Sequence, residues 1–290
     1  MSVALITVFT VALLFLFFLM GFEIGLSMAL AGFIGYVIMV GLDAALNLVA
    51  LDVWSVFSSY GFIVIPLFVL MGQIASNTGI SKGLYSCAYR FLGHVPGGLA
   101  IGTVAAATAF KAICGSSTAT SATFATIAIP EMDRYGYDKR LSCGTVATVG
   151  TLGVIIPPSV VLIIYGILTE TSIGKLFLAG IIPGLLIAFS FVVTLFGWCK
   201  INPKLGPGGE KSTWKARLAS LPSVAWVLAI FILVVGGLMQ GFFTPTEAGS
   251  VGAFSVFLLV LAKRDITWKS TLKSISDSLK IACMVLMLIL

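Results

Sequence analysis

Long apolar runs, separated by short polar or charged segments, dominate the pattern of this chain. A helix that crosses a bilayer needs about 20 predominantly apolar residues, and most of the runs approach or exceed that length. The pattern therefore predicts an all-α polytopic membrane protein whose surroundings are the lipid bilayer. The apolar runs cover 3–20, 24–40, 62–76, 99–129, 141–168, 175–198, 221–240, 246–262 and a last stretch from about residue 281.

Two neighbouring apolar runs are interrupted in their middle. The run 99–129 breaks at Gly115–Thr118, and the run 141–168 breaks at Pro157–Ser159. In hydrocarbon every backbone N–H and C=O must be satisfied within the protein, and unwound backbone is tolerated only where it is buried or lines a cavity. We therefore expect the two breaks to form one polar site near the bilayer midplane.

The chemistry of such breaks suits a small anion together with a cation. Broken helices expose N–H groups that attract anions and carbonyl groups that attract cations, and Ser116–Thr123 adds hydroxyl oxygens. This favours a carboxylate and a hard cation such as sodium. Two alternatives remain: small residues at Gly115–Thr120 also allow close helix packing, and Pro157-Pro158 also produces a simple kink.

Composition supports the membrane assignment and excludes several functions. The 290 residues are 59% hydrophobic and 10% charged, whereas soluble domains carry about 25% charged residues. The net charge of +6 reports membrane topology rather than nucleic-acid binding. His94 is the single histidine and the five cysteines form no CxxC motif, so we expect no enzyme activity, no organic cofactor and no metal other than sodium.

Basic residues predict the topology. If residues 99–130 form a re-entrant hairpin, every Lys and Arg except Lys111 and Lys175 falls on one side of the membrane. Because cytoplasmic loops are enriched in Lys and Arg, the hairpin is expected to open to the cytoplasm and the N-terminus to lie in the periplasm.

A weak internal similarity predicts an inverted repeat. Phe22–Gly25 and Thr246–Gly249 each open an apolar run with a Glu-X-Gly motif, and the two runs cross in opposite directions in the predicted topology. Inverted repeats are common in secondary transporters. The second copy is unfinished, so we expect this chain to be the N-terminal two-thirds of a longer protein. Glu23, Glu170 and Glu247 are interpreted as structural residues near helix ends.

Four regions follow from this pattern. We expect N-terminal helices at 1–76, a region with both interrupted runs at 77–200, a cytoplasmic loop at 201–220 and an incomplete second repeat at 221–290. Residues 77–200 would contain an interfacial helix, the re-entrant hairpin 99–130, the broken helix 141–168 and a helix at 175–198.

Several long motifs in the sequence resemble the large membrane (permease) subunit of tripartite ATP-independent periplasmic (TRAP) transporters. The resemblance covers most of the chain and is densest between Leu99 and Gly184. The motifs are A-I-C-G-S-S-T-A-T at Ala112–Thr120, I-P-E-M at Ile129–Met132, G-Y at Gly136–Tyr137, G-T-L-G-V-I-I-P-P-S at Gly150–Ser159, Y-G-I-L-T-E at Tyr165–Glu170 and S-I-G-K-L-F-L-A-G-I-I-P-G at Ser172–Gly184.

The resemblance implies a sodium-coupled importer of organic acids, such as C4-dicarboxylates, in the bacterial cytoplasmic (inner) membrane. It implies two partners, a small four-helix membrane subunit and a periplasmic solute-binding protein that acts as receptor. It also implies an elevator-type movement of a transport domain, whose first half would be residues 77–200, against a scaffold that would include the N-terminal helices at 1–76. Two alternatives remain open: a receptor-independent sodium/anion symporter of the same broad architecture, and a non-transporting scaffold subunit.

By the family pattern, the hairpin tip and the unwound part of the broken helix would hold sodium and substrate. Lys111 departs from the pattern because the family usually has a small residue there. Its side chain would either extend to the cytoplasm or alter ion or substrate preference. The candidate sodium- and substrate-binding residues are Gly115, Ser116, Ser117, Thr118, Thr120, Gly150, Thr151, Gly153, Pro157, Pro158 and Ser159.

Overall fold

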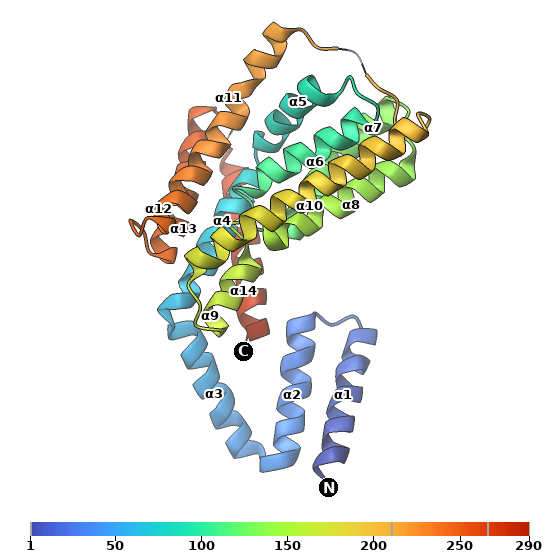
Figure 1. The fold of residues 1–290 in the computed structure, drawn as a ribbon. Coiled ribbons are helices and arrows are strands. Elements are labelled where there is room, and N and C mark those ends of the chain that lie inside the picture. The colour runs from blue at the N-terminus through green and yellow to red at the C-terminus, as the bar shows by residue number, and fades with distance from the viewer. Residues whose placement is uncertain (1, 210, 266, 290) are drawn as a thin grey trace. The chain divides into compact units, whose positions relative to one another are not determined.

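The computed structural model describes residues 2–209, 211–265 and 267–289, and every regular element in them is helical (Figure 1). This confirms the all-α class. The elements are α1 (Val3–Leu19), α2 (Ile24–Val40), α3 (Leu42–Ser58), η1 (Tyr60–Ile63), α4 (Val64–Ser76), α5 (Ile80–Leu92), α6 (Gly98–Lys111), α7 (Ser117–Arg134), α8 (Lys139–Ile155), α9 (Val160–Leu168), α10 (Ile173–Ile201), α11 (Trp214–Phe231), η2 (Ile232–Gly236), α12 (Gly237–Met239), α13 (Pro245–Ala262) and α14 (Trp268–Ile289).

Four stretches are long and apolar enough to cross a membrane. They are α8 with α9, α10, the stretch from α11 through η2 to α12, and α13. The pair formed by α3 and the following Tyr60–Ser76 passes the same criterion only as a bent pair, and α1, α2 and α6 are shorter apolar helices. The helices and their hydropathy confirm a polytopic membrane protein.

The chain divides into two compact units. The first combines Met1–Ile63 with Leu279–Leu290, and the second covers Val64–Ser278. In the first unit α1 and α2 pack together, with Gly35 of α2 directly against the Thr10 side chain. A Cβ atom at Gly25 would lie 3.6 Å from the backbone N of Leu288, so the last turns of α14 also pack on α2.

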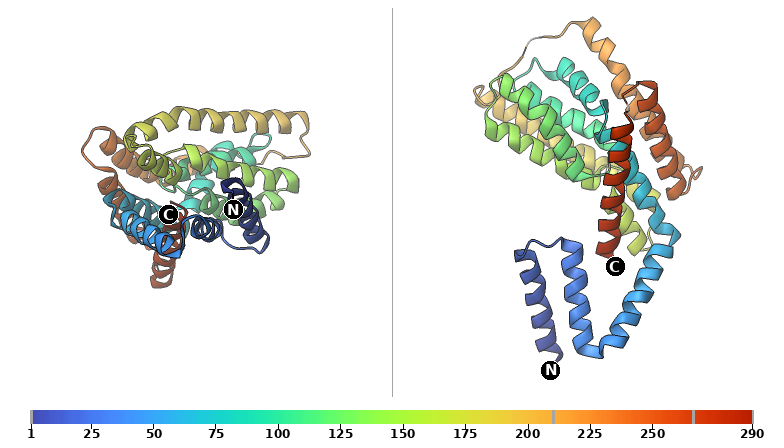
Figure 2. Two further views of the ribbon diagram at one scale, coloured as in Figure 1. Left: turned by 90° about the horizontal axis from the view of Figure 1, so that it is seen from below. Right: turned by 180° about the vertical axis from the view of Figure 1, so that it is seen from behind.

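In the second unit, α4 packs along α13 through small residues. A Cβ atom at Gly249 would lie 3.1 Å from Cβ of Leu67, and one at Gly252 would lie 2.6 Å from Sδ of Met71. Glycine lets two helix backbones approach closely in a membrane protein. The helices α6, α7, α8 and α10 pack beside one another as a second group in this unit (Figure 2).

Three loops meet at one end of the second unit. The N–H of Gly97, just before α6, donates to the carbonyl of Gly206 at 2.9 Å, and the N–H of Asp138, just after α7, donates to the carbonyl of Leu205 at 3.0 Å. The start of α6 and the end of α7 are thus fixed to the same α10–α11 loop. The pair α6–α7 is therefore a helical hairpin that returns to the end from which it starts.

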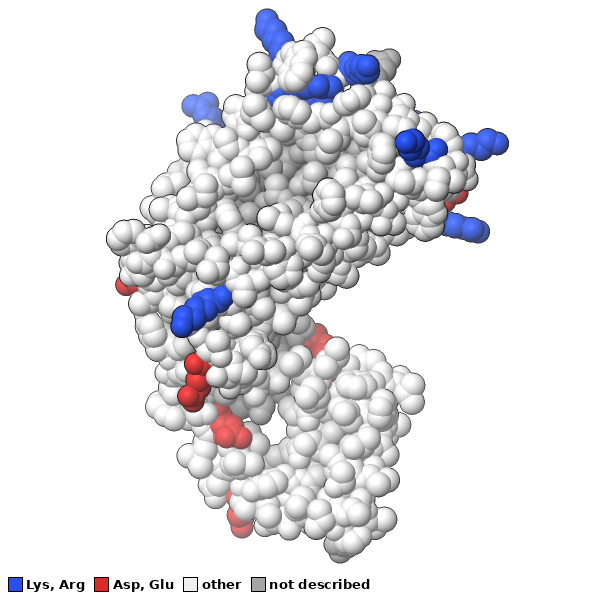
Figure 3. All heavy atoms as spheres, viewed as in Figure 1, with Lys and Arg blue, Asp and Glu red and all other residues white. Residues whose placement is uncertain are grey.

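This end carries exposed basic side chains, which gather there in Figure 3. Lys175 lies near the first residue of α10 and Lys200 near its last, and 29 residues of helix separate such ends by about 40 Å. This distance agrees with the prediction from the sequence that Lys175 lies on the opposite side of the membrane from Lys200. Which side of the membrane the basic end faces stays a prediction. The exposed residues at this end are Arg134, Lys139, Arg140, Lys200, Lys204, Lys211 and Lys215.

Of the three acidic residues near helix ends, Glu247 has the structural role that the sequence predicts. Glu247 completes a capping box at the start of α13: its Oε2 accepts the backbone N–H of Thr244 at 2.8 Å, and its own N–H donates to Thr244 Oγ1 at 3.3 Å. Glu23 occupies the N-cap position of α2, but its side chain makes no capping hydrogen bond. Glu170 follows α9 with a positive φ of 52°.

Tyr137 ties the hairpin to the basic end and generates a first prediction. Its hydroxyl accepts the backbone N–H of Leu99 at 3.1 Å, and burial raises its pKa to about 12. An unfolded tyrosine titrates near pH 10, so the stability that neutral Tyr137 contributes is complete below about pH 10 and is lost as pH rises toward about 12. Tyr137→Phe should lower stability near neutral pH by about 1 kcal/mol and reduce the alkaline loss, measured by thermal unfolding in detergent.

Tyr165→Phe is the matched control, because Tyr165 lies within α9 and its side chain is exposed. It should keep the neutral-pH stability of the wild type. An unchanged alkaline slope in Tyr137→Phe would contradict the assignment.

Candidate functional site

The hairpin tip is the unwound segment between α6 and α7. Helix α6 ends at Lys111 and α7 begins at Ser117, so Ala112–Ser116 form the tip. The predicted break is confirmed, although Ser117 and Thr118 already belong to the first turn of α7. Ser116 starts that helix, because its Oγ accepts the N–H of Ala119 at 3.2 Å as an N-cap.

The second break separates α8 from α9 at residues 156–159, and the prolines explain it. Proline has no N–H, so a proline four residues later leaves a helical carbonyl without its partner. Pro158 stands in that position relative to Val154, whose carbonyl instead accepts the Ser159 hydroxyl at 2.8 Å. The Pro157-Pro158 peptide bond is cis. The predicted break at 157–159 is thus confirmed, with its freed carbonyl satisfied locally, whereas Gly150 and Gly153, which the family pattern assigns to the unwound part, lie within helix α8.

The two breaks contact each other. A Cβ atom at Gly115 would lie only 2.7 Å from the carbonyl O of Pro158 and 3.5 Å from the backbone N of Val160. Gly150 of α8 likewise lies against Ser117 O and the Ser121 side chain. We call this contact, between residues 111–117 and 150–159, the tip junction. The absence of side chains at Gly115 and Gly150 is what allows the backbones to meet.

The candidate hydroxyl groups differ in whether they take part in the contacts of the tip junction. Thr120 is buried and donates to the carbonyl of Ser116 at 2.9 Å. Thr118 is exposed, with its Oγ1 3.1 Å from Ser116 Oγ. Thr151 is exposed and donates to Thr148 O of its own helix at 2.7 Å. The structure therefore brings the tip, Gly150, Gly153 and 157–159 together, and leaves the Thr151 hydroxyl outside these contacts.

Lys111 lies inside the tip junction, although it was not among the binding residues predicted from the sequence. Its side chain is 0% exposed, and its Nζ donates to the carbonyl of Ser116 at 2.7 Å. Nζ lies where a Cβ atom at Gly153 would stand. The alternative that Lys111 extends to the cytoplasm is wrong. The signal in the sequence was a lysine within an apolar run, but only the fold shows that it turns inward.

The ligand chemistry at this point is backbone carbonyl and hydroxyl oxygen, which suits a small cation. Among the described residues, no group of three or more His, Cys, Asp or Glu side chains converges on a metal site. At the carbonyl of Ser116, however, the Lys111 ammonium already occupies the cation's place. Sodium does not fit there while the lysine stays in position.

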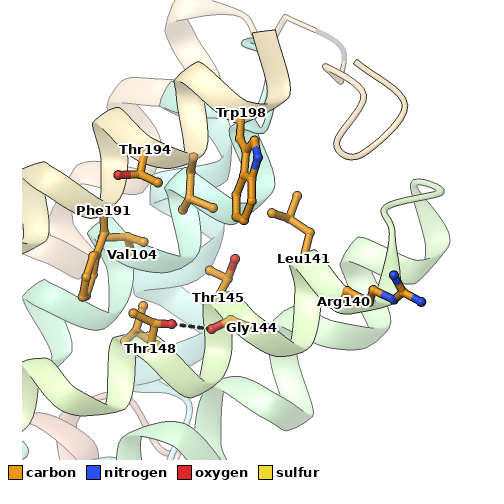
Figure 4. Close-up of a pocket in the computed structure, with 11 residues that line it drawn as sticks. Val104, Arg140, Leu141, Gly144, Thr145, Thr148, Phe191, Thr194 and Trp198 are labelled. Atoms are coloured by element: carbon orange, nitrogen blue, oxygen red, sulfur yellow. Dashed lines mark hydrogen bonds between the residues drawn. The ribbon is translucent and has the colours of Figure 1, made fainter. Parts of the chain in front are cut away.

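A separate pocket of about 180 Å³ lies between α6, α8 and α10 (Figure 4). Its lining is mostly apolar, and Trp198 extends into it, whereas the Arg140 guanidinium points away from it. Thr145 Oγ1 is buried there without a hydrogen-bond partner in the described chain, and Thr148 Oγ1 donates to Gly144 O at 2.6 Å. With no charged group pointing inward, this pocket suits a carboxylate less well than the tip junction does.

Comparison with known proteins gives a consistent result. The DctM component family of tripartite ATP-independent periplasmic transporters matches residues 11–290. The C4-dicarboxylate TRAP transporter large permease protein DctM of Pseudomonas aeruginosa is 37% identical over 241 residues, which are 83% of this chain and 56% of that protein. The protein of the same name from Vibrio cholerae is 33% identical over 268 residues, 92% of this chain and 57% of that protein.

A relative with a different named substrate is also similar. The 2,3-diketo-L-gulonate TRAP transporter large permease protein YiaN of Escherichia coli is 33% identical over 232 residues, 80% of this chain and 54% of that protein. The chain thus spans little more than half the length of the curated relatives it matches.

Gly115 provides a test of the tip junction. Gly115→Ala would place a methyl group 2.7 Å from a backbone oxygen that has no rotatable atom to yield, so the tip must shift. Overpacking of this kind costs about 1–3 kcal/mol. We expect a lower thermal unfolding temperature in detergent and faster maleimide labelling of Cys114, which is buried within the tip.

The control is Gly144→Ala on α8, where nothing lies within 4 Å of the new Cβ. Both variants also carry Cys143→Ala and Cys283→Ala, which remove the two exposed thiols that would otherwise react with the maleimide. Equal stability and labelling of Gly115→Ala and Gly144→Ala would disprove close contact at the junction.

Proposed function

The chain belongs to the DctM family of tripartite ATP-independent periplasmic transporters, and on that premise we propose that it forms the permease part of a sodium-coupled importer of organic acids. The observation that supports this most strongly is the tip junction, in which two broken apolar segments meet through Gly115 and Pro158. Unwound backbone inside a membrane protein is typical of transport sites. The chain is an integral inner-membrane permease with several apolar helices.

An organic acid is the substrate class that the site favours. Ser116 caps the start of α7, and the backbone N of Val160, at the start of α9, lies beside the same tip. Two helix N-termini near one point favour a carboxylate through their N–H groups and dipoles. The names of the relatives agree, since they refer to C4-dicarboxylate and to 2,3-diketo-L-gulonate. A C4-dicarboxylate or related carboxylate is therefore the proposed cargo.

Receptor dependence is part of the proposal. The family name describes a tripartite, periplasmic system, which supports a small membrane subunit and a periplasmic solute-binding protein as partners. The hairpin α6–α7 returns to the basic end of its unit, which supports a re-entrant hairpin open to the cytoplasm. The elevator movement would then carry the tip junction across the bilayer relative to the scaffold.

The test is organic-acid uptake into proteoliposomes under a sodium gradient. The complete permease, its small partner and the purified receptor are combined, and each is omitted in turn. We expect uptake that requires sodium and all three proteins. Uptake that persists without the receptor would instead support the receptor-independent symporter. Absence of uptake, with the small subunit still bound, would support the scaffold role.

Variants at the tip assign the transport to this site. Ser116→Ala removes the cap of α7, and Pro158→Ala restores an N–H that lets α8 and α9 continue into each other. Both should lower uptake about tenfold or more, a loss of about 1.4 kcal/mol in transition-state stabilisation, without loss of folded protein. Ser190→Ala is the control, because that hydroxyl donates only to Leu186 O on α10. Normal uptake in both tip variants would remove the site from this part of the chain.

A further inference from the structure

Lys111 is the charged side chain that the fold buries most unusually. Among the described residues, it alone of the Lys, Arg, Asp and Glu side chains is buried, with 0% exposure. Removing an ammonium group from water costs several kcal/mol unless other groups replace the lost hydration. A fold that keeps such a group inside must therefore provide oxygen ligands and favourable dipoles around it.

The surroundings of Lys111 meet that requirement without a carboxylate. Nζ donates to the carbonyl of Ser116 at 2.7 Å, and Ser117 Oγ borders the same space, 3.1 Å from the Cβ position of Gly153. Lys111 is also the last residue of α6, and Gly153 lies in the last turn of α8. The C-terminal ends of two helices carry partial negative charge, which stabilises a cation placed there.

The same features define a site for a small free cation. Carbonyl and hydroxyl oxygens near helix C-terminal ends are what broken helices offer to coupling ions. The ammonium group is tethered in this position, and two positive charges within a few ångströms repel strongly in a low-dielectric interior. A free cation and a charged Lys111 therefore exclude each other at the Ser116 carbonyl.

We propose that the Lys111 ammonium is a built-in cation of the tip junction and replaces a sodium ion there. Its charge is covalently held, so this junction needs no sodium to be occupied. Any sodium that drives uptake under the function proposed above binds elsewhere in the assembled transporter. Gly153 is also required for this arrangement, because a side chain at that position would displace the ammonium.

Sodium binding to the purified protein tests the proposal without transport. Thermal unfolding in detergent is compared in sodium chloride and in N-methylglucamine chloride of equal ionic strength. Lys111→Ala opens the position, so it should gain sodium stabilisation beyond any wild-type response, by about 3 °C or more. Lys111→Ser should gain it too, and provides the measurement if the alanine variant does not fold.

Two matched variants separate the vacated space from the lost charge. Lys111→Met removes the charge but fills the space, so it should gain no sodium response. In Lys111→Ala/Gly153→Ala the new methyl group occupies the position that Nζ left, so the sodium gain of the single variant should disappear. The single variant Gly153→Ala should lose stability, because its Cβ would overlap the ammonium, and Lys111→Ala should restore it.

The uptake assay gives an independent readout that rests on the proposed function. Lys111→Ala should raise the Hill coefficient for sodium by about one relative to the wild type, because one more ion accompanies each cycle. Gain of sodium stabilisation together with absence of uptake in every protein would support the built-in cation and reject the transport function.

Three results would overturn the proposal. The first is an equal sodium response in the wild type, Lys111→Ala and Lys111→Ser. The second is an equal gain in Lys111→Met and Lys111→Ala. The third is stabilisation by succinate that the wild type shows and Lys111→Ala loses without a sodium gain, which would assign Lys111 to binding the anion instead.

Discussion

The structure depends on the requirement that backbone groups freed inside a membrane be satisfied by the protein itself. Each break meets it with donors from its own segment. The prolines leave carbonyls without helical donors, and Ser159 satisfies that of Val154, while the tip carbonyl of Ser116 accepts Lys111 and Thr120. The close approach of Gly115 to Pro158 then places the two sets of groups against each other. The hairpin and the broken helix are therefore one structural element, although they lie in separate segments of the chain.

Much of this arrangement was predictable from sequence because the physical signals are local. Apolar runs of membrane length predict helices, and Pro157-Pro158 and Gly115 predict the breaks, since each acts on its own backbone. Helix α14 is longer than the pattern of apolar residues predicts. The apolar run was expected from about residue 281, but the helix begins at Trp268, because its first half is amphipathic. The Ser274 hydroxyl in that half accepts Asn77 Nδ2 at 3.1 Å and donates to Gln73 O at 3.3 Å, contacts that only the fold provides.

Lys111 is the clearest case of a residue whose role depends on a distant partner. A lysine near the middle of an apolar segment can extend toward water or turn inward, and its own neighbours in sequence do not decide between these directions. The space left by Gly153, 42 positions later by the numbering, makes the inward direction possible. The dipoles at the ends of α6 and α8 then make it favourable for a cation. The decision thus lies in packing between helices, which hydropathy along the chain does not describe.

A tethered cation changes how the junction responds to its surroundings. A free ion occupies its site according to concentration and its affinity, so the charge at such a site varies with the medium on each side of the membrane. The Lys111 ammonium has no such dependence while it stays protonated and bound to Ser116 O. The N-termini at the starts of α7 and α9 lie at the same junction, and the fixed positive charge adds to their attraction for an anion. Attraction of an organic acid would then no longer require that a cation arrive first, whereas release would need the junction to open. Under the proposed function this would separate two tasks that a free coupling ion performs together: attraction of the anion would pass to the protein, and the energy input would come from another step of the cycle.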